Sequence, residues 1–114
     1  MIVTTDNEVK LIDFNVAVGD LKPDSIVCGG TGLKQWSAPE TRTQLHYSAQ
    51  RCDSWSLGMI LAFLITGEEP SESASCEERM TAALSSTSDE CLQSCLQGLL
   101  RVKPEERLLP FQTL

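Results

Sequence analysis

The sequence lacks an apolar run long enough to cross a membrane, and it is short of positive charge. Its longest apolar stretch, from Leu57 to Ile65, is less than half of the roughly 20 residues that a membrane-spanning helix requires. Only 9 basic side chains stand against 16 acidic ones, and the resulting net charge of -7 repels a phosphate backbone. The sequence therefore predicts no membrane partner and no nucleic-acid partner.

Histidine is also scarce, and the cysteines do not form an even set. His46 is the single histidine and lies in a polar stretch, so we expect an exposed position without a catalytic role. The five cysteines are odd in number, and no basic segment, apolar run and cleavage site come before them. Cys91 and Cys95 are one helical turn apart, yet no second pair of metal ligands is evident. We expect free thiols in a cytoplasmic protein.

The first third of the chain predicts a hairpin followed by a long loop. Residues 2–5 and 9–12 are mostly β-branched or aliphatic, and Asp6-Asn7 between them tolerates the positive φ angles of tight turns. Residues 13–37 are rich in Gly, Asp, Ser and Thr and show no hydrophobic period. A loop of this length is usually functional or disordered.

The remainder predicts helices. Apolar residues at helical spacing over 50–66 are typical of a buried helix, and Gly67 provides a left-handed cap. Residues 71–88, rich in Ser and Glu, predict a solvated linker with one helix around 77–84. Ser86, with Asp89 three residues later, fits the start of an amphipathic helix, and Pro110 could begin a last short helix.

Four short motifs follow one another in a fixed order. They are Asp13-Phe14-Asn15 after a strand, Ala38-Pro39-Glu40, Asp53-Ser54-Trp55-Ser56-Leu57-Gly58, and Lys103-Pro104-Glu105-Glu106-Arg107. Each alone is a weak signal, since an Asp after a strand is usually a turn former. Together they resemble the Asp-Phe-Gly, Ala-Pro-Glu, Asp-x-Trp-Ser-x-Gly and Asp-Pro-x-x-Arg elements of eukaryotic-type protein kinases.

The resemblance covers essentially the whole chain and implies an incomplete domain. With 114 residues the chain is one domain at most. Residues 1–12 would form the β-hairpin, 13–40 the activation segment, and 41–114 the helical part of the large lobe. We therefore expect an α+β fold, a kinase-like C-lobe fragment that is mainly helical with an N-terminal β-hairpin.

The resemblance implies a metal-binding role for Asp13. In kinases the Asp at this position helps to hold the magnesium ion that bridges the nucleotide phosphates. Phe14 is expected to be buried. Asn15 stands where the family usually has Gly, and asparagine is the next most tolerant residue of positive φ. ATP and magnesium are the expected cofactors of a complete kinase, whereas we expect this chain alone to bind neither.

The loop from Asp13 to Glu40 resembles a serine/threonine-type activation segment. Gly30-Thr31 and Trp36 match that branch better than the tyrosine branch. Two extra residues before Trp36 leave tyrosine specificity open, because closing that gap puts Leu33 at the threonine position. Ser25 and Thr31 are candidates for phosphorylation, which could order the loop by pairing with arginine. Ala38, Pro39 and Glu40 close the segment.

Five residues are expected to have structural roles by the same resemblance. Glu40 and Arg107 match the buried ion pair that ties the activation segment to the far helices of the lobe. Asp53 is expected to cap the buried helix, because Asp accepts hydrogen bonds from first-turn amides. Trp55 and Gly58 complete the motif at the head of that helix.

The sequence also lacks the Gly-rich loop, the strand lysine with its helix glutamate, and the His-Arg-Asp loop that phosphoryl transfer requires. We expect a kinase fragment, of the serine/threonine type, that transfers phosphate from ATP to protein only when complete. The alternatives are a pseudokinase-like module that binds a partner protein through residues 36–47 or an exposed helix face, and a remnant without function. In the kinase lobe the central helix packs against a long preceding helix that this sequence does not contain. One apolar face of the central helix should therefore be uncovered, and we expect that the isolated chain is molten, aggregates or binds a partner.

Overall fold

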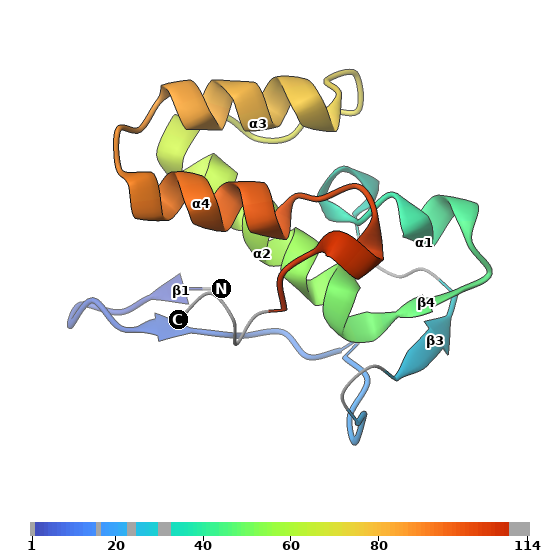
Figure 1. Cartoon of the computed structure of the whole chain (residues 1–114). Coiled ribbons are helices and arrows are strands. Elements are labelled where there is room, and N and C mark those ends of the chain that lie inside the picture. The colour runs from blue at the N-terminus through green and yellow to red at the C-terminus, as the bar shows by residue number, and fades with distance from the viewer. Residues whose placement is uncertain (1, 16, 23–24, 30–32, 110–114) are drawn as a thin grey trace.

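The computed structural model describes residues 2–15, 17–22, 25–29 and 33–109. Within them three helices pack together and two small antiparallel sheets lie on the side away from α3 (Figure 1). These three longer helices are α2 (Ala49–Thr66), α3 (Cys76–Ser85) and α4 (Glu90–Leu99). This confirms the expected mixed and mainly helical class. In the part of the chain that the structure describes, no helix has both the length and the apolar character to cross a bilayer.

The expected hairpin is present but shorter than predicted. Strands β1 (Ile2–Val3) and β2 (Val9–Lys10) pair antiparallel, with Ile2 opposite Lys10. Asn7 adopts a φ of 60°, as the turn requires. Val3 and Val9 are both exposed, so the pair has no apolar layer beneath it that would stabilise a longer ladder.

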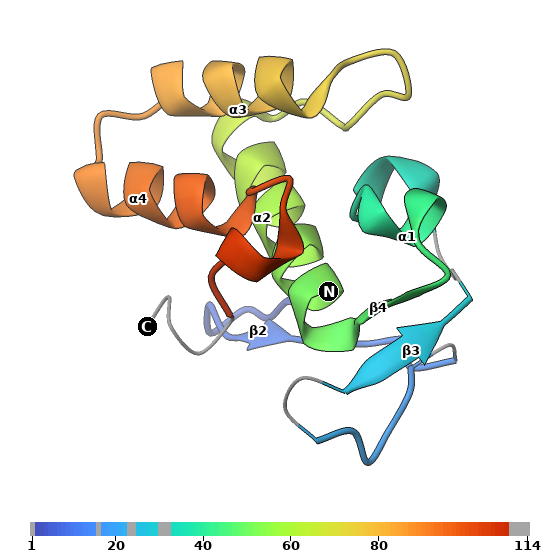
Figure 2. The same cartoon turned by 45° about the vertical axis from the view of Figure 1, so that its right-hand side comes forward.

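A second sheet lies where the sequence predicted only loop. Strand β3 (Ile26–Cys28) pairs antiparallel with β4 (His46–Ser48), and the Tyr47 hydroxyl donates a hydrogen bond to the Gly29 carbonyl. Tyr47 is buried, whereas His46 is exposed, as expected. The long loop is thus fastened at its middle to the segment that leads into α2 (Figure 2).

Helix α2 has about the predicted length and the predicted cap at its C-terminal end, but a different cap at its N-terminal end. The Ser48 side chain accepts a hydrogen bond from the Arg51 amide at 3.4 Å, and Gly67, with a φ of 73°, ends the helix. Asp53 is exposed and lies in the second turn of the helix, beyond the amides that need a cap. The prediction that Asp53 caps this helix was therefore wrong.

Helices α3 and α4 begin at side-chain caps. Ser75 and Glu78 form a reciprocal capping box at α3, with bonds of 3.1 and 2.8 Å. Asp89 caps α4 by accepting from the amides of Cys91 and Leu92. The predicted start at Ser86 is wrong, because Ser86 instead ends α3 and Asp89 is the residue next to the first turn. The helix predicted from Pro110 lies outside the described residues.

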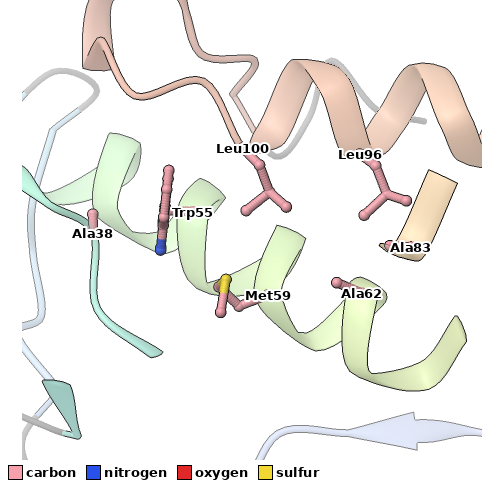
Figure 3. Packing of buried hydrophobic residues seen from close by; sticks show 7 residues of the cluster. All are labelled: Ala38, Trp55, Met59, Ala62, Ala83, Leu96 and Leu100. Carbon is pink, nitrogen blue, oxygen red and sulfur yellow. The ribbon is translucent and has the colours of Figure 1, made fainter. Parts of the chain in front are cut away.

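The core is a seam between these helices (Figure 3). It comprises Ala38, Trp55, Met59, Ala62, Ala83, Leu96 and Leu100. Gly58 permits the close approach of α2 to the end of α4, since a Cβ added there would lie 2.8 Å from the Leu100 side chain and 2.9 Å from that of Leu99. The packing distance between α2 and α4 therefore depends on this glycine.

Candidate functional site

The predicted ion pair between Glu40 and Arg107 is present. Glu40 begins the short helix α1 (Glu40–Thr43), and Arg107 follows the 3-10 turn η2 (Pro104–Glu106). The Arg107 guanidinium donates from Nη1 to Oε1 of Glu40 at 2.6 Å and from Nη2 to Oε2 at 3.1 Å. Glu40 is 2% exposed and Arg107 is 1% exposed. A bidentate contact of this kind fixes the relative orientation of the two side chains as well as the distance between them.

Arg107 also saturates its remaining donors on backbone carbonyls. Its Nε donates to the carbonyl of Arg101 at 2.9 Å, and Nη1 donates to that of Arg51 at 2.6 Å. In return the Arg51 side chain donates to the Arg107 carbonyl. The guanidinium carbon lies 5.0 Å from the centre of the Trp55 ring, within the range of a cation–π contact. The buried charge is thus paired and hydrogen-bonded, which is the condition for burying it.

Cys52 completes this cluster, and sequence reasoning missed it. Its thiol donates to Oε1 of Glu40 at 3.5 Å. Burial, followed by the negative charge of Glu40, raises the pKa of Cys52 to about 12, so the thiol keeps its proton at neutral pH. A cysteine that adjoins a motif without belonging to it carries no signal of this role in the sequence.

The end of the long loop is fixed to α2 through Trp36 and Ala38. Trp36 ends the 3-10 turn η1 (Lys34–Trp36); its carbonyl accepts from the Ser56 hydroxyl at 3.3 Å, and its ring meets Phe63 edge-on at 6.0 Å. Ala38 is buried in the core, and Pro39 precedes the first turn of α1. The motif from Ala38 to Glu40 is therefore held from both sides, by the helix core and by Arg107.

The residues at the other end of the loop are exposed. Asp13 is exposed and has a φ of 64°, and Phe14 is 64% exposed. The expectation that Phe14 is buried was wrong, because the strand before it has no apolar layer to pack on. Asn15 is exposed and does not have a positive φ, so replacing glycine at this position puts no strain on the observed backbone.

The role of Asp13 as a magnesium ligand stays a prediction. Asp13 is the one sequence-predicted ligand, and no group of three His, Cys, Asp or Glu side chains that could hold a metal ion occurs among the residues described. Magnesium is usually held by one or two carboxylates together with phosphate oxygens. Asp13 would supply one such carboxylate, and the phosphate oxygens would come from a nucleotide.

The two phosphorylation candidates differ in what is known of their surroundings. Ser25 is half-buried just before β3, and its carbonyl accepts from the Ala49 amide at 3.2 Å. Thr31 lies outside the described residues. Phosphorylation of either residue stays a prediction.

Comparisons with known proteins find protein kinases. A family model described as Protein kinase domain matches residues 1–114. Sperm motility kinase 2A of Mus musculus is 35% identical over 78 residues, which are 68% of this chain and 15% of that protein. Serine/threonine-protein kinase 33 of Bos taurus is 30% identical over 112 residues, covering 88% of this chain and 23% of that relative. Sperm motility kinase 3A of Mus musculus is 29% identical over 113 residues, covering 94% of this chain and 22% of that relative. This chain spans less than a quarter of the length of each of these relatives.

Proposed function

The chain belongs to the protein kinase domain family, and from that premise we propose that it forms the activation segment and the rear of the large lobe of a serine/threonine kinase domain that acts on protein. Residues 1–12 are its hairpin, 13–40 its activation segment and 41–114 its helical part. The observation that carries the proposal is the buried contact between Glu40 and Arg107. This contact joins the end of the proposed activation segment to the helical part. The activation segment of a kinase must be fixed in position at this end.

The anchored stretch from Trp36 to Glu40 is the part best suited to support a protein substrate. It is fixed to α2 by the Trp36 carbonyl and ring and to Arg107 by Glu40, so its backbone is positioned before a substrate arrives. Positioning is the main contribution of a kinase to phosphoryl transfer. The name of the relative in Bos taurus, a serine/threonine-protein kinase, supports that branch over tyrosine.

Phosphoryl transfer itself requires residues that are not among these 114. The Gly-rich loop, the strand lysine and the His-Arg-Asp loop would bind ATP and supply the base. We infer that these 114 residues alone are inactive and bind neither ATP nor magnesium. In a complete domain Asp13 would be one of the magnesium ligands, and the setting would be the cytoplasm.

The transcript upstream of the Met1 codon provides the decisive test. If it encodes the missing motifs in frame, the longer product should transfer radiolabelled phosphate from ATP to a protein substrate, and Asp13→Asn should abolish that transfer. Asp20→Asn is the matched control, because Asp20 is also an exposed aspartate with positive φ in the same segment. A stop codon in frame, or equal loss in both variants, would contradict the proposal.

A second candidate is a pseudokinase-like module that binds a partner protein. The observation in its favour is the exposure of Leu57 and Leu64, 39% and 63%, on the same face of α2. Such a face is costly to leave in water. The two candidates separate by isothermal titration of the longer product with magnesium and ATP, since a kinase binds them and such a module does not.

A further inference from the structure

A cavity of about 270 Å³ lies between the end of the proposed activation segment and the start of α3. The loop before α3 and the short helix α1 lie on the same side of α2 (Figure 2). The polar and aromatic residues that line the cavity include Lys34, Arg42, Trp55, Glu72, Cys76 and Arg79. The volume lies just under the roughly 300–1,000 Å³ of sites for small molecules, which leaves room for an acidic side chain.

Three of the lining residues are cations without a carboxylate partner. Lys34, Arg42 and Arg79 form no ion pair with any described residue, although Glu72 lines the same cavity. Arg79 donates from Nη1 to the Gln35 carbonyl at 3.1 Å, and Arg42 donates to the Lys34 carbonyl. Both guanidinium groups are thus held in place by backbone oxygens. Clustered positive charge is unusual in a chain whose net charge is -7.

Like charge and burial both act on Arg79. Burial lowers the pKa of Arg79, the Cys76 thiol opposes that change, and the positive charge of Arg42 lowers the pKa further. An arginine stays protonated in proteins despite such effects. A negative charge placed beside Arg79 would oppose both effects.

Two of the residues that line the cavity each have a buried hydrogen-bond donor without an acceptor. These donors are Nε of Arg79 and the indole Nε1 of Trp55, and neither finds a partner among the described residues. Trp55 is 4% exposed. A buried donor that is left unpaired costs free energy, and native structures contain few of them. Because both are donors, only an acceptor could satisfy them.

We propose that this cavity binds the oxyanion of an acidic side chain, a carboxylate or a phosphate, carried by a peptide segment of a protein substrate. Planar guanidinium groups bind carboxylate and phosphate oxygens with paired hydrogen bonds, and the Lys34 ammonium adds a point charge at the rim. The inference rests on the proposed function only in naming the peptide as a substrate. Its test measures binding rather than phosphate transfer, so each can fail without the other.

The test uses three blocked tripeptides, Ala-Glu-Ala, Ala-phosphoserine-Ala and Ala-Gln-Ala, titrated into the full 114-residue chain. Nuclear magnetic resonance follows the indole N–H signal of Trp55 and the Nε–H signal of Arg79. Both signals should move with the two anionic peptides and stay in place with the glutamine peptide. Tighter binding of the glutamate or of the phosphoserine peptide identifies which oxyanion the site prefers.

Lys34→Gln and Lys10→Gln form a matched pair of variants. Each removes one exposed lysine charge, but only Lys34 lines the cavity. Lys34→Gln should weaken binding of the anionic peptides about two- to fivefold, the range for one exposed charge, and Lys10→Gln should not. Arg79→Gln should weaken binding about tenfold or more, and Lys34→Gln keeps the test valid if that variant unfolds. Equal shifts with the glutamine peptide, or equal weakening by Lys10→Gln, would overturn the proposal.

Discussion

The carboxylate of Glu40 and the guanidinium of Arg107 face each other across 67 residues of sequence, joined by two hydrogen bonds of 2.6 and 3.1 Å. Both side chains are buried, and the pair sits between the end of the proposed activation segment and the last helical turn. Because so many backbone oxygens also bind Arg107, the contact joins three separate stretches of chain. It is therefore the point where a single substitution should have the largest effect.

Glu40→Ala or Arg107→Ala should lower the free energy of unfolding by about 3–5 kcal/mol, because each leaves the other charge buried without its partner. Urea unfolding followed by tryptophan fluorescence measures this directly. Lys103→Ala is the control, since it breaks an exposed pair with Glu106 at 3.7 Å and should change stability far less. Unchanged unfolding in both buried variants would contradict the structural role of the pair.

Gly58→Ala should destabilise the chain by about 1–3 kcal/mol through overpacking. The added methyl would lie within 3 Å of side-chain atoms of both Leu99 and Leu100. Gly19→Ala is the control, because a Cβ at Gly19 would meet no atom within 4 Å. Equal unfolding midpoints in urea for the two variants would show that α2 and α4 have room to separate.

The features that could be predicted from sequence are those with a local cause. The cap at Gly67 and the helix that follows Ser75 depend on residues close in the chain, and both are found. The meeting of Glu40 with Arg107 is not local; it was predicted because the four motifs resemble a family in which those positions pair.

The features that were missed depend on contacts between distant residues. The pairing of β3 with β4 joins residues 26–28 to residues 46–48, and neither stretch has a pattern that selects the other. The exposure of Phe14 and the thiol contact of Cys52 with Glu40 likewise follow from what lies nearby in space. Asp53 was placed at the cap of α2 because its residue type fits, but Ser48 occupies that position.

Stability should fall more steeply above pH 9 in the natural chain than in Cys52→Ala. The thiol has a pKa of about 12 when folded and 9.0 as its reference value, so the unfolded chain loses this proton first. Its contribution is therefore fully present below pH 9 and is lost as the pH rises toward 12. Urea unfolding midpoints at pH 7, 9 and 10 measure the difference.

Two comparisons make the Cys52 prediction specific. Cys76 and Cys95 also have raised pKa values through burial, so the relevant quantity is the difference between the natural chain and Cys52→Ala at each pH. In the folded chain at pH 8, iodoacetamide should label the exposed Cys28 and Cys91 well before Cys52. Parallel pH profiles for the two proteins, or early labelling of Cys52, would contradict the buried contact with Glu40.

The exposed face of α2 should govern how the isolated chain associates. Leu57 and Leu64 are seven residues apart, so they lie on one side of the helix, and both are exposed. Leu64→Gln should reduce self-association in sedimentation velocity and the binding of a hydrophobic dye, while the free energy of unfolding stays within about 0.5 kcal/mol. Leu45→Gln makes the same change at another exposed leucine outside α2 and should leave association unaltered. A chain that is already monomeric before any substitution, or equal effects of the two variants, would mean that this face needs no cover.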